Sequence, residues 1–162
     1  MGISGKTKVC GVIGDPIEHT LSPIMHNAAF NALNLDYVFL ASKVKPAEVE
    51  NAINGMRALN IRGLNVTMPH KTPVLKFLDR TDLSAQIINS VNTILNRDNK
   101  LFGFNTDGVG ALKALRENGV ELKGRKVLLL GAGGAARAIA YTMAKEADEL
   151  AVLNRSLKPA QE

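Results

Sequence analysis

The sequence is poor in cysteine and in large aromatic residues, with one cysteine, two tyrosines and no tryptophan. A single cysteine, Cys10, cannot form a disulfide within the chain, which is typical of the reducing cytoplasm. No apolar run approaches the roughly 20 residues of a membrane-spanning helix, and the first residues lack the long apolar segment of a signal peptide. The sequence therefore predicts a cytoplasmic protein without a membrane partner. Cys10 lies in an apolar segment, so we expect it to be a buried filler.

The charge is basic, with a formal net charge of +5 over 162 residues and an isoelectric point of about 9.5. A nucleic-acid-binding protein can have this balance. However, the lysines and arginines are dispersed, and only two tyrosines and no tryptophan are available to stack on bases. We therefore predict no nucleic-acid partner. A small anionic substrate with a phosphate-rich cofactor explains the charge equally well, and a lysine-rich surface without such ligands remains open.

The segment around which the chain is organised is KVLLLGAGGAAR, residues 126–137. Its apolar run is typical of a buried strand, and Gly131-x-Gly133-x-x-Ala136 is the spacing of dinucleotide-binding turns. Gly131 permits the tight turn, Gly133 lets the backbone approach a pyrophosphate, and Ala136 lets the following helix pack closely. The N-terminus of that helix offers N–H groups to phosphate. The alternative is a glycine-rich turn that binds nothing.

The residues after the next apolar run distinguish between the two nicotinamide cofactors. An NAD-binding chain usually places an acidic residue there, about 20 residues after the first glycine. This chain has Asn154, Arg155 and Ser156 instead. Because no carboxylate repels a 2′-phosphate and Arg155 can pair with one, the sequence favours NADP over NAD. The alternative for Arg155 is a solvated loop cation.

Apolar strand-like runs alternate with helical patterns, which predicts an α/β fold. We expect an N-terminal α/β substrate domain with a mostly parallel mixed sheet, residues 1–107, followed by residues 108–162 as a linker helix and the first β-α-β unit of a Rossmann-type NADP-binding domain. Strands are expected at 8–13, 37–41, 63–66, 91–95, 100–103, 127–130 and 150–153; helices are expected at 23–33, 46–59, 85–88, 107–118 and 135–145, and a short one ends near 78.

Local signals refine several of these elements. Ser22 before Pro23 predicts a helix with Ser22 as N-cap, and Ser84 is expected to cap a later helix. Residues 96–99 are expected to form the turn of a hairpin. The first helix is expected to bury four small or apolar residues, Met25, Ala28, Ala29 and Ala32.

Three polar clusters follow predicted strands, at residues 19–22, 65–71, and 92–93 with 105–107. In open α/β sheets, ligands bind outside the carboxyl ends of strands. Hydroxyls, amides, one lysine and one aspartate suit a small polyhydroxylated anion. Periodicity alone does not name that anion.

Six motifs in order resemble the NADP-dependent shikimate dehydrogenase family over the whole chain. They are GDPIEHTLSPIMHN (14–27), NVTMPHK (65–71), VNT (91–93), GFNTDGVG (103–110), GAGGAAR (131–137) and NRS (154–156). The resemblance implies reversible reduction of 3-dehydroshikimate to shikimate with NADPH, in aromatic amino-acid biosynthesis. It also implies a substrate domain, a Rossmann domain and a site between them.

The resemblance also implies residue roles. Thr20 and Ser22 would hold the substrate carboxylate, and Thr67, Asn92 and Asp107 would bind ring hydroxyls. Lys71 would be the catalytic acid–base residue, working beside Asp107. A lysine can do this if its pKa moves toward neutrality or a neighbour relays the proton, whereas Asp107 favours the protonated form. The cofactor-binding set would be Gly131, Ala132, Gly133, Gly134, Ala135, Asn154, Arg155, Ser156 and Lys158.

Each catalytic assignment has a plainer alternative. Lys71 could be a surface lysine on a short helix, and Asp107 could be only an N-cap. His19, His26 and His70 are interpreted as structural or rim hydrogen-bonding residues, because no third ligand accompanies them on a helix, so no metal site is predicted.

The chain also departs from the family pattern. Thr20 stands where the family usually has serine, and Lys158 is followed by Pro159, which shifts or removes a second phosphate contact. The family continues beyond one β-α-β unit. We therefore expect a truncated enzyme that binds the adenosine end of NADP weakly and turns over poorly or not at all. A quinate/shikimate dehydrogenase, a non-catalytic shikimate-binding fragment and a homodimer remain open.

Overall fold

The computed structural model describes residues 2–156 as two compact units. The first unit comprises the described residues up to Asp82 together with Val91–Phe104. The second comprises Leu83–Ser90 and the described residues from Asn105 onward. The short segment 83–90 therefore leaves the first unit, and the chain then returns to it for one hairpin.

The first unit is built on a six-stranded mixed sheet with the strand order β2-β1-β3-β5-β6-β4. β1 pairs in parallel with β2 and β3, and β4 pairs in parallel with β6, whereas β5 is antiparallel to both β3 and β6. This confirms a mostly parallel mixed sheet. The strands are β1 (Lys8–Gly14), β2 (Tyr37–Lys43), β3 (Gly63–Val66), β4 (Arg80–Thr81), β5 (Thr93–Arg97) and β6 (Lys100–Phe104).

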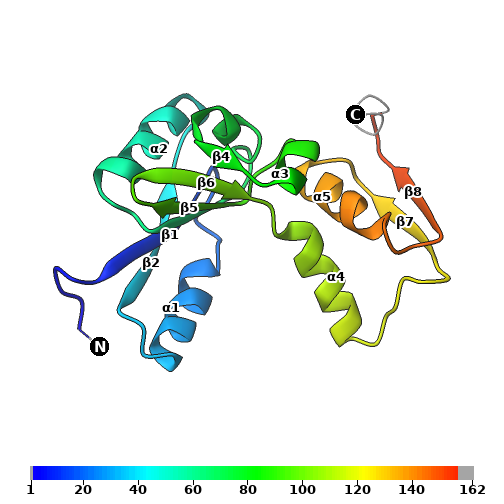
Figure 1. Cartoon of the computed structure of the whole chain (residues 1–162), viewed down its shortest axis with the longest axis horizontal. Coiled ribbons are helices and arrows are strands. Elements are labelled where there is room, and N and C mark those ends of the chain that lie inside the picture. The colour runs from blue at the N-terminus through cyan, green and yellow to red at the C-terminus, as the bar shows by residue number, and fades with distance from the viewer. Residues whose placement is uncertain (1, 157–162) are drawn as a thin grey trace. The chain divides into compact units, whose positions relative to one another are not determined.

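Two helices cover opposite faces of this sheet, α1 (Ser22–Ala32) and α2 (Val49–Ala58), the latter preceded by the 3₁₀ turn η1 (Pro46–Glu48) (Figure 1). The α2 side holds most of the core, because alternate strand residues point to it. The residues of this core are completely or almost completely buried: Ile53, Met56, Leu64, Val66, Val74, Ile94 and Leu101. On the α1 side, a smaller cluster joins Val12, Ile17 and Phe39 to half-buried Phe30.

The orientation of α1 differs from the sequence prediction. No residue of this helix is fully buried, and Met25, Ala28, Ala29 and Ala32 all lie on its exposed side. His26 stacks on Phe39 with ring centroids 4.2 Å apart. The side chain of Asn27 accepts a hydrogen bond from Phe39 N–H (2.8 Å) and donates one to Phe39 O (2.9 Å). A polar residue therefore faces the sheet, because it satisfies the backbone of edge strand β2.

The observed helix starts also correct three capping predictions. The N-cap of α1 is Leu21, and Ser22 is already helical. Helix α3 (Leu83–Ile87) likewise contains Ser84 instead of beginning after it. In both cases the helix starts earlier than the hydroxyl signal indicated. Helix α4 (Asp107–Glu117) has Thr106 as its N-cap residue, without a side-chain cap, so the interpretation of Asp107 as the N-cap is also wrong.

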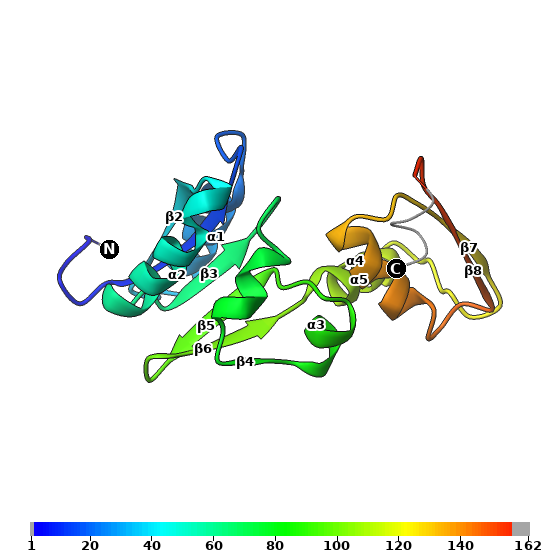
Figure 2. The same ribbon diagram turned by 90° about the horizontal axis from the view of Figure 1, so that it is seen from above.

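Strands β5 and β6 form a hairpin (Figure 2). Because Arg97 pairs with Lys100, the turn consists of two residues, Asp98 and Asn99, and not of the four expected. Both residues have positive φ, 52° and 61°, as a two-residue hairpin turn requires. Asn96 is consequently a buried strand residue whose side-chain amide donates to Met56 O at 3.4 Å. The hairpin thereby contacts the end of α2.

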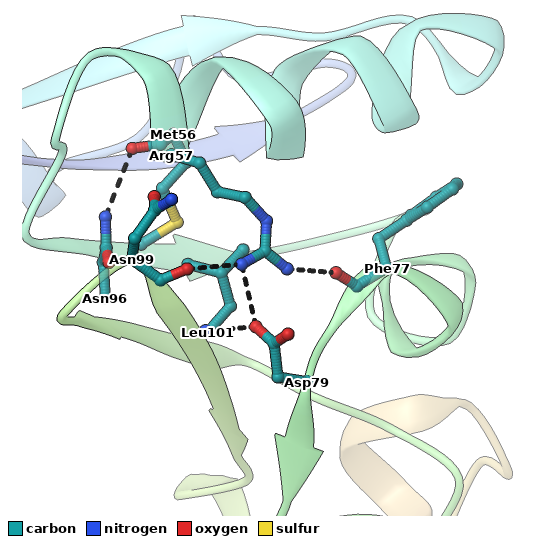
Figure 3. Close-up of polar contacts among 7 residues, drawn as sticks. All are labelled: Met56, Arg57, Phe77, Asp79, Asn96, Asn99 and Leu101. Atoms are coloured by element: carbon teal, nitrogen blue, oxygen red, sulfur yellow. Dashed lines mark hydrogen bonds and ion pairs between the residues drawn. The ribbon is translucent and has the colours of Figure 1, made fainter.

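Arg57, at the end of α2, joins two other segments of the first unit, residues 77–79 and the β5–β6 hairpin (Figure 3). Its Nη1 lies 2.8 Å from both Asp79 Oδ2 and Asn99 O, and its Nη2 donates to Phe77 O at 3.1 Å. Asp79 Oδ2 also accepts the Leu101 N–H at 2.7 Å. These bonds lower the pKa of Asp79, the Leu101 N–H most and Arg57 next. The network fixes the 3₁₀ segment η2 (Pro73–Phe77) against the hairpin.

In the second unit, α4 and α5 (Gly134–Met143) lie side by side (Figures 1 and 2). They pack with the parallel strands β7 (Lys126–Leu130) and β8 (Glu149–Leu153). Leu112, Leu122 and Met143 form its buried cluster, with half-buried Val127 and Ile139 against it. The predicted β-α-β unit is therefore present, with α5 connecting two parallel strands.

Candidate functional site

The candidate substrate residues of the first unit follow strand ends at one edge of its sheet. Thr20 and Ser22 come after β1, Thr67 and Lys71 come after β3, and Asn92 immediately precedes β5. Since β5 is antiparallel to β3, its beginning lies at the end of β3. All five residues are half-buried, which leaves part of each side chain accessible.

The loop that carries Thr20 is held close to the loop that carries Thr67. Gly14 explains how, because a Cβ at this position would overlap the Thr67 Cγ2 methyl and lie 3.1 Å from Met68 O. The Asp15 N–H donates to Met68 O at 3.1 Å, and the Thr67 N–H donates to Ile13 O at 2.9 Å. Glycine is therefore required at position 14 by the close approach of the two loops.

Thr20 and Ser22 are joined through their hydroxyls. Thr20 Oγ1 donates to Ser22 Oγ at 3.1 Å and accepts the Ser22 N–H at 3.3 Å. The same loop is anchored by Lys43, which lies 2.9 Å from Glu18 Oε1 and 3.5 Å from Asp15 Oδ1. Hydrogen bonds from Lys43 and from the N–H groups of Glu18 and Ile17 lower the pKa of Glu18 to about 2. The pair of hydroxyls is thus presented by an anchored loop.

Lys71 is fixed through its backbone and through its neighbour His70. Lys71 O accepts the Val91 N–H at 2.8 Å, and the His70 N–H donates to Thr67 O at 3.0 Å. The His70 ring is fully buried, and its Nε2 lies 2.6 Å from Val44 O. A carbonyl oxygen only accepts, so this nitrogen carries the proton. The structure confirms His70 as a structural hydrogen-bonding residue.

Asn92 is tied to the same strands. Its carbonyl accepts the Val66 N–H at 2.8 Å, and its own N–H donates to Phe104 O at 3.0 Å. Its side-chain Oδ1 accepts a bond from Thr93 Oγ1 at 2.9 Å. The structure therefore brings the segments of Thr67, Lys71 and Asn92 together within the first unit.

Asp107 belongs to the second unit, where it is the first residue of α4. Its N–H donates to Asn105 Oδ1 at 3.0 Å, and Asn105 Nδ2 donates to Ser90 O at 2.9 Å. Asn105 is buried, so it holds the start of α4 rigidly against segment 83–90. The sequence showed Asn105 only as part of a polar cluster and did not indicate this supporting role.

Two glycines of the turn between β7 and α5 differ in backbone conformation. Gly131 has a φ of 105°, which side chains rarely adopt, and its N–H donates to Leu153 O at 2.8 Å. Gly133 has an ordinary extended backbone, and a Cβ there would meet no atom within 4 Å. Internal packing therefore does not require glycine at position 133. The backbone at Gly133 is open to an approaching group, and the Gly131-x-Gly133 spacing fits a dinucleotide pyrophosphate.

Helix α5 begins at Gly134, so the N–H groups of its first turn point toward this loop. Asn154, Arg155 and Ser156 follow β8. Asn154 Nδ2 donates to Ser156 O at 2.8 Å, and Arg155 is exposed. This arrangement fits a nucleotide phosphate beside Arg155. Lys158, the remaining predicted cofactor residue, lies outside the described residues.

Residues 2–156 contain no cluster of three or more His, Cys, Asp or Glu side chains placed to hold a metal. Within the same residues, no helix combines the length and apolarity that crossing a bilayer requires. Cys10 is half-buried, and burial raises the pKa of its thiol.

The fold and the candidate site define an α/β protein in which a mixed-sheet domain precedes the start of a Rossmann-type domain. A family model described as the shikimate dehydrogenase substrate binding domain matches residues 12–94. The chain belongs to the shikimate dehydrogenase family.

Relatives of known sequence agree with this assignment. The shikimate dehydrogenase (NADP(+)) of Carboxydothermus hydrogenoformans is 50% identical over 162 residues, which are 100% of this chain and 58% of the relative. That of Methanocaldococcus jannaschii is 48% identical over 159 residues, 98% of this chain and 56% of the relative. The chain thus spans a little over half the length of the curated relatives it matches.

Solved structures extend the similarity to the fold. A shikimate dehydrogenase crystallised with NADP+ matches with a TM-score of 0.95 and 48% identity, over 99% of this chain and 55% of that one. The Listeria monocytogenes shikimate 5-dehydrogenase in complex with shikimate and NAD matches with a TM-score of 0.92 and 44% identity, over 98% of this chain and 56% of that one.

Proposed function

We propose that the protein is an NADP-dependent shikimate dehydrogenase of aromatic amino-acid and chorismate biosynthesis, which reversibly reduces 3-dehydroshikimate to shikimate. The observation that carries this proposal is the grouping of Thr20, Ser22, Thr67, Lys71 and Asn92 at one edge of the first unit's sheet. The family membership and the names of the relatives support it.

In the proposed complex, each polar residue binds one kind of group on the substrate. The joined hydroxyls of Thr20 and Ser22 bind the substrate carboxylate, since two donors from an anchored loop suit a planar anion. Thr67 and Asn92 hydrogen-bond to ring hydroxyls, and Asp107 contributes a carboxylate to the same hydroxyl groups. Hydroxyl-rich ligands require such fixed donors and acceptors.

Lys71 and Asp107 form the proposed acid–base pair. When shikimate is oxidised, the alcohol carbon loses a hydride and the alcohol oxygen loses a proton, and Lys71 accepts that proton. In the reverse direction, protonated Lys71 returns the proton to the oxygen of the ketone. Asp107 orients the ammonium group and the hydroxyl. The bond from Val91 N–H to Lys71 O fixes the backbone from which the lysine side chain extends.

NADP supplies the hydride acceptor when bound. Its pyrophosphate is assigned to the loop formed by Gly131, Ala132, Gly133, Gly134 and Ala135. The 2′-phosphate is assigned to Asn154, Arg155 and Ser156, and Lys158 is kept as a further candidate. Arg155 presents a planar fork of donors to phosphate, and no carboxylate in this segment opposes it.

We also propose a division into a substrate-binding and catalytic domain up to residue 107 and a cofactor domain after it. A cytoplasmic location, a small-molecule substrate and the absence of a nucleic-acid partner complete the proposal. They rest on the composition and on the family membership.

The test is a single-turnover assay with the protein in excess over NADP+. Shikimate is added, and absorbance is followed at the NADPH band. We expect NADPH to form only when both ligands are present, and the rate to fall about 100-fold or more in Lys71→Ala, as loss of general acid–base catalysis predicts. Lys76→Ala, an exposed lysine in the same segment, serves as the matched control. Equal rates in the parent and Lys71→Ala would refute the proposed role.

The same assay distinguishes the related activities. Comparable rates with quinate would identify a quinate/shikimate dehydrogenase. Binding of shikimate and NADP+ without any formation of NADPH would identify a non-catalytic binding protein. Arg155 favours NADP+, so replacement of NADP+ by NAD+ is expected to lower the rate.

A further inference from the structure

Gly108, the second residue of α4, lies in close contact with α5. It is buried, and a Cβ built on it would overlap Ala138 O and Thr142 Oγ1 and lie 3.0 Å from the Ala138 carbonyl carbon. Thr142 Oγ1 is itself hydrogen-bonded to Ala138 O at 3.0 Å. The obstacle is partly backbone, which cannot rotate away as the end of a flexible side chain can. Any side chain at position 108 therefore forces the two helices apart.

Gly108 begins a stripe that continues along both helices. On α4 the stripe is Gly108, Leu112 and Arg116, spaced by four residues, as one face of a helix requires. Leu112 packs with Met143, and Arg116 Nη2 lies 2.7 Å from Glu146 Oε2. The partners of this stripe advance along the chain in the same order, from Ala138 through Met143 to Glu146, which lies just beyond α5. This close contact lies at the N-terminal end of α4 and between the middle and the C-terminal end of α5, where Ala138 and Thr142 lie.

The contact of Gly108 with Ala138 lies near both parts of the second unit that take part in the proposed chemistry. Asp107 directly precedes Gly108, and the glycine-rich loop ends one turn before Ala138. The N–H of Asp107 is held by buried Asn105. The distance at which α4 crosses α5 therefore sets the position of Asp107 relative to the dinucleotide loop.

Gly110 shows that the requirement is specific to position 108. It lies two residues further along the same helix and is exposed, and a Cβ there would meet no atom within 4 Å. If Gly108 served only to start α4, it would not need to lie so close to α5. Gly108 and Gly110 thus offer a matched pair of substitutions in one motif.

We propose that Gly108 is a positioning residue, which holds Asp107 in place for the substrate through the close contact of α4 with α5. This role rests on the proposed function, because it acts through the contact of Asp107 with shikimate. A side chain at position 108 would displace α4 from α5. Because protein interiors are nearly close-packed, packed helices transmit such a displacement instead of absorbing it.

The experiment is a double-mutant cycle on the whole 162-residue chain. Affinity for shikimate is measured by calorimetry for the parent, Gly108→Ala, Asp107→Asn and the double variant, with Gly110→Ala as control. Asp107→Asn is expected to weaken binding by about tenfold, as loss of one charge-assisted hydrogen bond predicts. Gly108→Ala is expected to weaken it by a similar factor, and the double variant no more than Asp107→Asn alone. Gly110→Ala is expected to match the parent.

A purely structural role for Gly108 predicts a different result of the double-mutant cycle. If the losses from Gly108→Ala and Asp107→Asn multiply in full, or if Gly108→Ala binds as the parent does, the positioning role is overturned. Thr142→Leu enlarges the α5 side chain that faces Gly108. If Gly108→Ala fails to fold, Thr142→Leu replaces it in the double-mutant cycle with Asp107→Asn. Failure of the parent to bind shikimate would overturn the proposed function and this role with it, whereas binding by the parent with a fully multiplicative cycle overturns this role alone.

Discussion

The backbone N–H of Val91 donates to the carbonyl oxygen of Lys71 at 2.8 Å. This bond joins two motifs that are 20 residues apart in the sequence, and it fixes the backbone of the proposed catalytic lysine. The neighbouring His70 reinforces it, because its buried ring donates to Val44 O at 2.6 Å.

We predict that His70→Leu disturbs both stability and catalysis. The substitution leaves Val44 O without its buried donor, which costs about 1–3 kcal/mol in the free energy of unfolding. Because Lys71 is the next residue, kcat is expected to fall more than KM for shikimate changes. Urea unfolding and steady-state or single-turnover rates measure the two effects. His19→Leu, at an exposed position, is the control; equal losses in both variants would contradict the prediction.

A second prediction concerns the Arg57–Asp79 pair. Arg57→Ala removes its bonds to Asp79, Phe77 O and Asn99 O, and is expected to lower the free energy of unfolding by about 1–2 kcal/mol, since both side chains are partly exposed. Thermal or urea unfolding measures it. Arg97→Ala, which replaces an exposed arginine of the β5–β6 hairpin, should change stability little. A loss no larger than that of this control would show that the network does not stabilise the unit.

The same pair predicts a pH dependence. The Leu101 N–H and Arg57 lower the pKa of Asp79 below its ordinary value. The stabilisation from ionised Asp79 is therefore complete above that ordinary value, about 4, and is lost as the pH falls through the lower, folded-state pKa. The stability difference between the parent and Asp79→Asn should stay constant from neutral pH to about pH 5 and shrink below about pH 4. Asp98→Asn, at a 93% exposed side chain, should show no such change.

Asn27 is expected to matter for α1 more than any apolar residue on that helix. Its side chain makes two hydrogen bonds to the backbone of Phe39, on edge strand β2. Asn27→Ala leaves that N–H and carbonyl without partners, which we expect to cost about 1–3 kcal/mol in unfolding free energy. Asn31→Ala, at an exposed position of the same helix, is the matched control. Equal stability of the two variants would contradict the role given to Asn27.

Arg155 is predicted to set the preference for NADP+. Arg155→Ser should weaken NADP+ about tenfold or more and change NAD+ affinity little, because only NADP+ carries the 2′-phosphate. Calorimetric titrations with both nucleotides measure the ratio. Arg125→Ser, another exposed arginine of the second unit, should leave the ratio unchanged. An equal loss for both nucleotides in Arg155→Ser would place Arg155 elsewhere than at the 2′-phosphate.

The sequence predicted the strands and the glycine-rich turn well, because alternating and continuous apolar runs and the Gly131–Gly133 spacing depend on local chemistry. It failed on α1, where the four residues that were predicted to be buried face outward and Asn27 faces the sheet. That orientation depends on the backbone of β2, 12 residues away, and no periodicity within the helix reveals it. The two-residue strand β4 was missed because its pairing with β6 is set by the Arg57–Asp79 network.

The candidate site likewise contains residues that the sequence could predict and residues that it could not. Its motif residues could be named from the sequence, but their supports could not. Gly14, Gly108 and Asn105 each depend on an atom from a distant segment: Thr67, Ala138 and Ser90 respectively. A glycine in a sequence does not indicate which neighbour requires it, so these contacts became visible only in the folded chain.

The measurement that tests the central claim most directly is calorimetric titration of this chain with shikimate, beside Thr67→Val. Thr7→Val, a threonine before β1, is the control. We predict saturable binding to one site, weakened about tenfold in Thr67→Val because a hydroxyl contact is lost, and unchanged in Thr7→Val. Absence of saturable heat in the folded parent, or equal affinity in the parent and Thr67→Val, would contradict the assignment of this site to shikimate.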